Sequence, residues 1–279
     1  MNDRVETVTA SIVFAAGKGS RMVGFSGNKT LLPLVAGDSL YDGSRPILLE
    51  VLDNLPPGPK GLVVSHCAED VKRATSHLGV QYIFQPETNG TGGALLVSRE
   101  LIETDPSGRW IITMGDVPLI LPSTYEKLIG KLDECEMVLL GFEPEDKAQY
   151  GMIEMQGEHA LRIVEWKYWS EWPAEQRELL RFCNAGVYAA RRDALLRYLD
   201  RLASRPHKVR KQRGETWVTI EEYFLTDLIE MMSTDGLPIG LVVSDADEVV
   251  GVDTPDALRF VQKRYALRSL TAPGEASPQ

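Results

Sequence analysis

A glycine-rich turn, Ala15-Ala16-Gly17-Lys18-Gly19-Ser20-Arg21-Met22, follows the first apolar stretch of the sequence. A second lysine stands a few residues later, in Asn28-Lys29-Thr30-Leu31-Leu32. The backbone N–H groups of such a turn can approach an anion closely, and phosphate is the usual one. The two cations Arg21 and Lys29 on the same loop suit the spread charge of a triphosphate.

Three interpretations of this turn compete. A dinucleotide-binding fingerprint needs a small residue where Met22 stands, so the GxGxxG pattern fails. A P-loop needs Gly-Lys followed by Ser or Thr, whereas Gly17-Lys18 is followed by Gly19. The third interpretation is a glycine turn without a ligand, which is the default for an isolated turn. The neighbouring cations favour phosphate binding over that default.

Two aspartates stand where apolar strands are predicted to end. Asp116 lies in Thr113-Met114-Gly115-Asp116-Val117-Pro118-Leu119, and Asp253 lies in Val249-Val250-Gly251-Val252-Asp253-Thr254-Pro255. Carboxylates at the C-terminal edge of a sheet suit Mg²⁺, which takes one or two of them together with substrate phosphates and water. The alternatives are that Asp116 caps a turn and that Asp253 caps the following helix. Two such aspartates make a metal-binding pair plausible.

A polar loop, Gln85-Pro86-Glu87-Thr88-Asn89-Gly90-Thr91-Gly92, lies between a predicted strand and a predicted helix. Gln85 can read the edge of a nucleobase through two hydrogen bonds, and Gly90 and Gly92 permit close approach by backbone. Taken alone, the segment is an ordinary turn.

Other arrangements give weaker signals. The sequence has no GxSxG motif for a serine nucleophile. Ser65-His66-Cys67 continues a predicted strand, which directs neighbouring side chains to opposite faces, so we expect His66 to be structural. The tryptophan-rich run Trp166–Trp172 is interpreted as packing, although it could stack on a sugar or a base. The basic run Lys208–Arg213 is interpreted as a solvated loop.

The elements that must position these loops alternate between strands and helices in the first half of the chain. The predicted strands are Val8–Ala16, Gly61–Ser65, Val80–Gln85, Trp110–Asp116 and Met137–Phe142; the predicted helices are Pro46–Leu55, Glu69–His77, Gly92–Glu103 and Pro122–Leu132. Strands rich in Val and Ile that alternate with helices predict βαβ units and a mainly parallel sheet. Ligands of such sheets bind at the C-terminal edge.

The second half is more mixed. We expect a hairpin of Gly151–Met155 with Ala160–Lys167, strands Cys183–Ala190 and Ile239–Ser244, helices Asp193–Leu202, Glu221–Met232 and Thr254–Tyr265, and an exposed loop Ser204–Gly214. The tail 271–279, rich in proline and small residues, is predicted to be disordered.

Composition excludes several classes of protein. The 279 residues are 43% hydrophobic, which is typical of a folded globule. Forty acidic against thirty basic residues give a net charge of −10, which disfavours nucleic acid as a partner. Neither a bilayer-length apolar run nor a signal core is present, so we expect no membrane and a cytoplasmic location. The three cysteines form no CxxC pair, and the four histidines lack HxxxH spacing.

Taken in order, these segments resemble the uridyltransferase domain of bacterial N-acetylglucosamine-1-phosphate uridyltransferases, within the sugar nucleotidyltransferase (nucleoside-diphosphate-sugar pyrophosphorylase) family. Five further motifs carry the resemblance, which spans roughly Val8 to Tyr265: Tyr150-Gly151, Ile163-Val164-Glu165, Asn184-Ala185-Gly186-Val187-Tyr188, Glu222-Tyr223-Phe224-Leu225-Thr226-Asp227 and Gly251-Val252-Asp253.

The resemblance implies an α/β, GT-A-like (Rossmann-like) nucleotidyltransferase fold with a mixed, mainly parallel sheet flanked by helices. It implies a single domain, 1–270, with a sugar-binding subregion at about 144–220. The implied reaction converts UTP and a sugar 1-phosphate, with N-acetylglucosamine 1-phosphate as the first candidate, into a UDP-sugar and pyrophosphate. A relative that uses another nucleotide or acceptor phosphate, and a catalytically silent nucleotide-sugar sensor, are the alternatives.

The resemblance also implies a role for each residue that matches a family motif. The nucleotide phosphates would be bound by Ala15, Ala16, Gly17, Lys18 and Gly19, and catalysis would depend on Arg21, Lys29 and Asp116. Uracil would be bound by Gln85, Gly90 and Thr91, the sugar by Gly151, Glu165 and Asn184, and Mg²⁺ by Asp116 and Asp253.

The sequence departs from the family pattern in three ways. Asn28 stands where the family usually has proline, and Val23–Gly27 is about a residue longer, so we expect this loop to differ. Asp253 replaces the asparagine of the nearest relatives. The hexapeptide repeats of the acetyltransferase domain are missing from the sequence, so we expect neither acetyl transfer nor acetyl-CoA binding.

Overall fold

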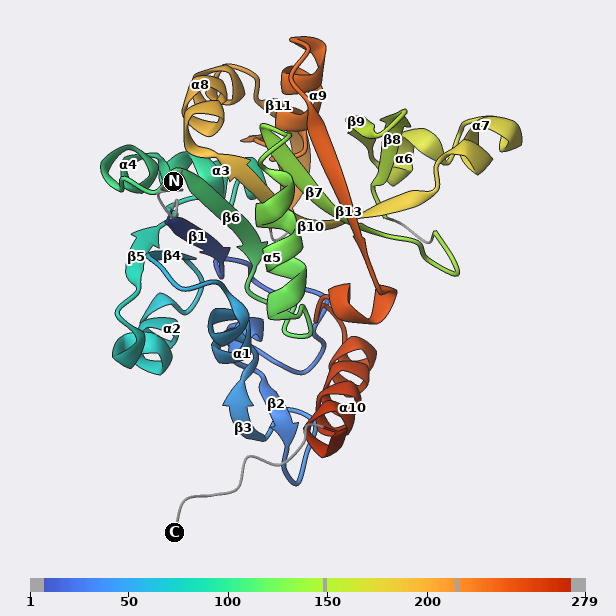
Figure 1. Ribbon diagram of the computed structural model, residues 1–279. Coiled ribbons are helices and arrows are strands. Elements are labelled where there is room, and N and C mark those ends of the chain that lie inside the picture. Colours follow the sequence, from blue (N-terminus) through green and yellow to red (C-terminus); the bar gives the residue numbers. More distant parts are fainter. Residues whose placement is uncertain (1–7, 148–149, 214–215, 272–279) are drawn as a thin grey trace.

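The computed structural model describes residues 8–147, 150–213 and 216–271 (Figure 1). Within these residues the strands form a nine-stranded central sheet with the order β13-β7-β10-β6-β1-β4-β5, to which β8 is added beside β10, and β9 beside β8. The strands are β1 (Thr9–Phe14), β4 (Lys60–Val64), β5 (Gln81–Phe84), β6 (Arg109–Met114), β7 (Met137–Phe142), β8 (Met152–Gln156), β9 (His159–Val164), β10 (Phe182–Arg191) and β13 (Ile239–Ser244).

The sheet is mixed, and its central path is mainly parallel, as the sequence predicts. Strand β1 pairs in parallel with both β4 and β6, whereas β10 runs antiparallel between β6 and β7. The chain leaves β1 toward β4 and β5 and then returns to the other side of β1 as β6. The loops after β1 and β6 therefore lie on either side of a topological switch point, where ligands of open α/β sheets bind.

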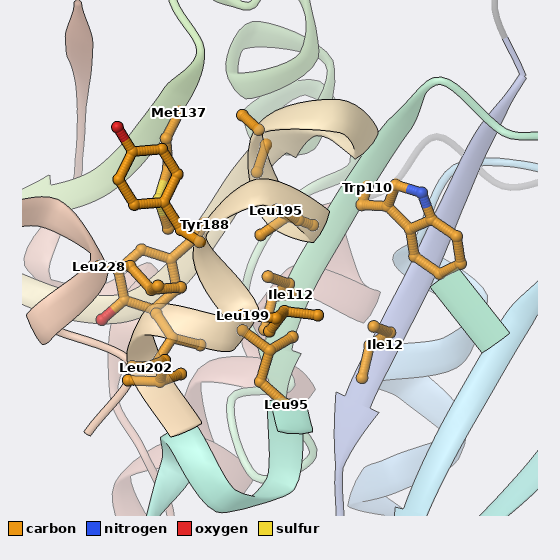
Figure 2. Close-up of a cluster of buried hydrophobic side chains, with 14 of the residues drawn as sticks. Ile12, Leu95, Trp110, Ile112, Met137, Tyr188, Leu195, Leu199, Leu202 and Leu228 are labelled. Carbon is orange, nitrogen blue, oxygen red and sulfur yellow. The ribbon is translucent and has the colours of Figure 1, made fainter. Parts of the chain in front are cut away.

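Helices cover both faces of the sheet (Figure 1). One face packs against α3 (Thr91–Val97), α4 (Arg99–Thr104), α8 (Arg192–Ala203) and α9 (Asp227–Thr234), and the other packs against α1 (Ile47–Asn54), α2 (Ala68–Thr75) and α5 (Pro122–Lys131). Alternate residues of β1 serve the two cores, because successive side chains of a strand point to opposite faces. Ile12 lies with Trp110 and Ile112 in the first core (Figure 2), and Val13 lies in the second.

A third, smaller core ties the N-terminal loops to the last helix. It joins residues before and within the hairpin of β2 (Pro33–Ala36) and β3 (Gly43–Pro46) to α10 (Pro255–Thr271). Met22 and Leu32 pack there with Val252 and Leu258. Because Met22 follows Arg21 and Val252 precedes Asp253, this core fixes the two candidate loops relative to each other.

The region 204–226 differs from the prediction. His207–Arg213 forms β11, which pairs antiparallel with β12 (Thr216–Glu222), and α9 begins only at Asp227. The expected loop Ser204–Gly214 and the expected helix start at Glu221 are therefore wrong. The β-branched and aromatic run Thr216–Ile220 favours a strand, and it imposes the ladder on its basic partner.

Other elements agree closely with the prediction. The hairpin β8–β9 forms, but its second strand ends at Val164 rather than at Lys167, because α6 (Trp166–Trp169) begins there. The last helix continues to Thr271 rather than ending at Tyr265. The predicted disordered tail falls almost wholly on 272–279, outside the described residues. Across the described ranges, no helix combines the length and the apolar character needed to cross a membrane.

Candidate active site

Four charged side chains from three segments meet beyond the ends of β1 and β6. Lys29 lies in a short 3₁₀ helix, η1 (Lys29–Leu31), and its Nζ donates to both Asp116 Oδ2 and Asp253 Oδ1. Arg21 Nη2 donates to the other oxygen of Asp253 at 2.6 Å. The Lys29 and Asp116 side chains are each 13% exposed, whereas Arg21 is 70% exposed. The Lys29–Asp116 ion pair is thus partly buried, and Arg21 is a solvent-exposed cation at its edge.

Opposing effects act on the Lys29 ammonium. Burial alone lowers the pKa of Lys29, because a low-dielectric environment disfavours charge. The charges and hydrogen bonds of Asp116 and Asp253 outweigh burial and raise the pKa above its ordinary value. Lys29 is therefore a charged ammonium at neutral pH.

The two aspartates make ion pairs instead of caps. In α10, Thr254 Oγ1 accepts a hydrogen bond from Ala257 N at 3.2 Å, while the described side-chain bonds of Asp253 go to Lys29 and Arg21. The Asp116 carbonyl accepts from Val252 N at 2.9 Å. That backbone bond joins the two aspartate segments directly.

The glycine turn lies open above this cluster. Ala15 and Ala16 are 1% and 5% exposed and continue the strand, whereas Gly17 and Lys18 are exposed. A side chain at Gly17 would meet nothing within 4 Å. Gly19 has φ +61°, and a Cβ there would lie 3.2 Å from Lys29 Cβ. The stem of Lys29 therefore passes directly beside the turn.

Asn28 holds this arrangement in place. Its Nδ2 donates to the carbonyls of Ala15 at 2.8 Å and His66 at 2.9 Å. Its Oδ1 accepts from Thr30 N at 3.0 Å and from Thr30 Oγ1 at 2.8 Å. The side chain is buried and connects the end of β1, the segment after β4 and the 3₁₀ helix that carries Lys29. The residue that departs from the family pattern is therefore the cap of this helix.

The loop after β5 is closed by the segment that follows β12. Gly92 N donates to Tyr223 O at 2.8 Å, and Tyr223 N donates to Asn89 O at 2.9 Å. Gly90 has φ +95°, and a Cβ there would lie 2.3 Å from Tyr223 O. Gln85 is 3% exposed, and its Nε2 donates to Asn89 Oδ1 at 3.1 Å. The glycines thus have a role within the protein, namely close packing of two backbones.

A pocket of about 1030 Å³ opens beside this loop. Glu165, Asn184 and Thr91 line it together with Met114, which lies two residues before Asp116. Gly151 is not a lining residue; its carbonyl accepts from Asn184 N at 2.9 Å, and a Cβ there would lie 3.5 Å from Glu165 Oε2. The structure therefore brings the three predicted sugar-binding residues together, with Gly151 behind the other two.

Two polar side chains of the pocket differ in their surroundings. Burial raises the pKa of Glu165, the positive charge of Lys167 opposes this, and the negative charge of Asp227 adds to it. Asn184 lies at a bulge of β10, where its Nδ2 donates to the Tyr188 hydroxyl at 2.8 Å. Both side chains suit recognition of hydroxyl groups.

Three residues that line this pocket were given no attention in the sequence: Arg162, His207 and Glu230. Seven others stand in the tryptophan-rich run or in motifs of the family resemblance but had no individual role assigned: Trp166, Tyr168, Trp172, Tyr188, Phe224, Thr226 and Asp227. The packing interpretation of the tryptophan-rich run holds for Trp169, which is 6% exposed, and for Trp172, which packs against the same core and also lines the pocket; Trp166 is 41% exposed and lines the pocket. His207 directly precedes the basic run, and its Nε2 lies 2.7 Å from Asp227 Oδ2.

The expectation for Ser65-His66-Cys67 is wrong in its geometry. Strand β4 ends at Val64, and Cys67 adopts φ +53°, so the chain turns and Cys67 Sγ lies 3.3 Å from His66 Nε2. The same nitrogen lies 3.2 Å from Ser26 O, in the loop before Lys29.

The donor set at the cluster suits a hard divalent cation. In the part of the chain that the structure describes, no group of three or more His, Cys, Asp and Glu side chains could hold a metal. Asp116 and Asp253, however, direct carboxylate oxygens at the same ammonium. Mg²⁺ commonly takes two protein carboxylates and completes its octahedron with substrate oxygens and water, so the residues fit this ion.

A sheet of this kind, with cations and paired carboxylates at its switch point, is typical of α/β enzymes that transfer phosphoryl or nucleotidyl groups. Residues 11–210 match the MobA-like NTP transferase domain, and the chain belongs to this family. This result confirms the resemblance inferred from the motifs.

Two curated relatives are bifunctional GlmU proteins. That of Thermus thermophilus is 34% identical over 257 residues, which cover 91% of this chain and 51% of the relative. That of Ruegeria sp. strain TM1040 is 31% identical over 248 residues, which cover 88% of this chain and 50% of the relative. The chain therefore spans about half the length of the curated relatives it matches.

Solved structures confirm the fold. The uridine diphosphate N-acetylglucosamine pyrophosphorylase of Trypanosoma brucei, solved with an inhibitor, has a TM-score of 0.70 at 14% identity and covers 91% of this chain and 65% of its own. A CMP:2-keto-3-deoxy-manno-octonic acid synthetase, solved with CTP, has a TM-score of 0.63 at 18% identity. The match covers 94% of this chain and 99% of the synthetase chain.

Replacing Asn28 by alanine should lower the free energy of unfolding by about 1–3 kcal/mol, because the buried carbonyls and the Thr30 amide lose their partner. Asn54→Ala is the matched control: its Nδ2 makes two bonds of 3.4 Å at a partly exposed position, so the loss should stay below about 1 kcal/mol. Urea unfolding of both variants measures the difference. Equal losses would mean that Asn28 is not the anchor of this loop.

Proposed function

We propose that the chain transfers a uridylyl group from UTP to a sugar 1-phosphate, with N-acetylglucosamine 1-phosphate as the first candidate. The products are a UDP-sugar and pyrophosphate. The observation that carries this proposal is the meeting of Lys29, Arg21 and the two aspartates beside the pocket that Glu165 and Asn184 line. The name of the Trypanosoma brucei protein, a uridine diphosphate N-acetylglucosamine pyrophosphorylase, supports the choice of nucleotide sugar.

The residues suit a reaction driven by alignment and charge. A sugar 1-phosphate is already an anionic nucleophile, so the transfer needs no general base. In this proposal the backbone of Gly17–Gly19 cradles the nucleotide phosphates, and Lys29 stabilises charge at the reacting phosphoryl group. Arg21, which is exposed at the rim, stabilises the departing pyrophosphate.

The proposed base site is the loop closed by Tyr223. Gln85 is held by Asn89, so its amide is preorganised to read uracil together with Gly90 and Thr91. We further propose that residues 1–270 form one nucleotidyltransferase domain with its sugar-binding part at about 144–220. Support for the latter is that β8, β9 and β10 bring Gly151, Glu165 and Asn184 together.

We also propose that Asp116 and Asp253 hold a catalytic Mg²⁺. When bound, the ion would neutralise and polarise phosphoryl oxygens of the substrates. Lys29 and Arg21 would complement it from the glycine-turn side.

The decisive experiment measures pyrophosphate release with each NTP against a panel of sugar 1-phosphates. We expect UTP with N-acetylglucosamine 1-phosphate to give the highest kcat/KM, because a wrong base leaves buried polar groups unpaired. Equal or better turnover with CTP, GTP or dTTP contradicts the choice of UTP. Release with no pair at all favours a nucleotide-sugar sensor.

Lys29→Ala should lower kcat by about a hundredfold or more while changing nucleotide affinity much less. A compact charge beside the transferring phosphoryl group interacts most strongly in the transition state. Steady-state kinetics with varied UTP separate the two effects, and Lys72→Ala on the surface of α2 is the control. Wild-type turnover in Lys29→Ala would show that the lysine has another role.

Removal of divalent metal with EDTA should abolish turnover, and Mg²⁺ should restore it. Asp116→Asn should be inactive. Asp253→Asn should instead raise the Mg²⁺ concentration for half-maximal rate, because the amide oxygen can still ligate. A rate that survives excess EDTA, or unchanged magnesium dependence in both variants, would contradict the metal site.

A further inference from the structure

Two cations compete for the point between Asp116 and Asp253: the Lys29 ammonium and the proposed divalent ion. The structure places the Lys29 ammonium there, with a hydrogen bond to each carboxylate. The proposed function places a divalent ion on the same carboxylates. Two cations held at one point repel each other strongly in a partly buried site, so they cannot both use it.

We propose that Lys29 is an internal placeholder for the divalent ion: its ammonium holds the carboxylates together until metal binds, and metal binding releases it toward the phosphates. This inference rests on the metal site of the proposed function. It assigns Lys29 a role before catalysis, as a cation that competes with metal.

Burial explains why a placeholder is needed. Asp116 is 13% exposed, and two unpaired carboxylates aimed at one point would repel each other and lose hydration. Lys29 removes that repulsion. Arg21 contributes less, because it is 70% exposed and bonds only to the outer oxygen of Asp253.

The path of the side chain makes the exchange possible. A Cβ at Gly19 would lie 3.2 Å from Lys29 Cβ and 3.4 Å from its Cγ and Cδ, so the stem runs alongside the glycine turn. Asn28 fixes the backbone at the base of that stem. An ammonium that leaves the carboxylates therefore stays close to the backbone expected to bind phosphate.

The charges couple metal to nucleotide. Without metal, Lys29 and Arg21 neutralise the two carboxylates, which leaves Lys18 as the cation of the glycine turn that can pair with a triphosphate. A divalent ion takes over that neutralisation and leaves both cations for the nucleotide. Each ligand should then strengthen binding of the other by the same factor.

Acetylation with sulfo-N-hydroxysuccinimide acetate tests the exchange in the wild-type protein. The reagent attacks neutral, accessible amines, so Lys29 should react slowly in metal-free buffer and about tenfold faster with saturating Mg²⁺ at matched ionic strength. Peptide mass spectrometry measures the rate at each lysine. Lys72 is the internal control, since it pairs with Glu69 at 2.8 Å far from the carboxylates. An unchanged Lys29 rate would overturn the proposal.

Binding of Mn²⁺ alone, followed by electron paramagnetic resonance of the free ion, tests the competition. Lys29→Met should bind Mn²⁺ about tenfold more tightly than wild type, and Arg21→Met should change the affinity by less than about threefold. Lys29→Gln, which keeps a hydrogen-bond donor without the charge, should also tighten binding and serves if Lys29→Met folds poorly. Affinity no tighter than wild type in the folded lysine variants would overturn the proposal.

These measurements need no turnover, so the two proposals fail separately. Metal-dependent exposure of Lys29 without pyrophosphate release would retain the placeholder and reject the transferase. Pyrophosphate release without such exposure would retain the transferase and reject the placeholder.

Discussion

The ion pair of Lys29 with Asp116 and Asp253 is the interaction on which the rest of the site depends. The Lys29 and Asp116 side chains are each 13% exposed, and charges buried to this degree are stable only when they are matched, so the three segments that carry Lys29, Asp116 and Asp253 must lie together. The parallel pairing of β1 with β6 positions the glycine turn and the Asp116 segment relative to each other, because Gly115 N donates to Phe14 O at 2.9 Å where both strands end. The small core that includes α10 positions the Asp253 segment. Fold and electrostatics therefore impose the same geometry.

The surrounding architecture separates rigid from adaptable functions. The groups that we propose to bind phosphate stand on the loops of the inner parallel strands, whose side chains are packed between two helical layers. The pocket with Glu165 and Asn184 is built from antiparallel additions to that sheet, β8, β9 and the bulged strand β10. In the proposed function, the phosphoryl transfer would therefore take place at the core sheet, and the acceptor would be recognised by the strands added to it.

Local patterns in the sequence were sufficient for most of the fold and for the candidate residues of the glycine turn, the loop after β5 and the two aspartates. Strand β6 ends just before Asp116 as predicted, but the strand predicted before Asp253 is wrong: β13 ends at Ser244, and the 3₁₀ helix Ala246–Val249 and an irregular segment lead to Asp253. Contacts distant in sequence could not be obtained this way. The ribbon His207–Glu222 was missed because its first strand is basic and gains its structure from the second. The contact of His66 with Cys67 depends on a left-handed backbone that no side-chain pattern signals. The family resemblance, not the spacing of residues, supplied the assignments to uracil and sugar.

The junction between the loop after β5 and the segment after β12 is made of main chain on both sides. Tyr223 takes part through its N–H and C=O groups, whereas a Cβ at Gly90 or Gly92 would lie within 2.3 Å and 2.7 Å of its backbone. This contact restricts the two sides of the junction differently. The side chain at position 223 can change without loss of the two backbone hydrogen bonds, whereas a side chain at either glycine would collide with the backbone of Tyr223. Substitutions in the ribbon or in the pocket can therefore leave this backbone junction, and the position of the loop after β5, unchanged.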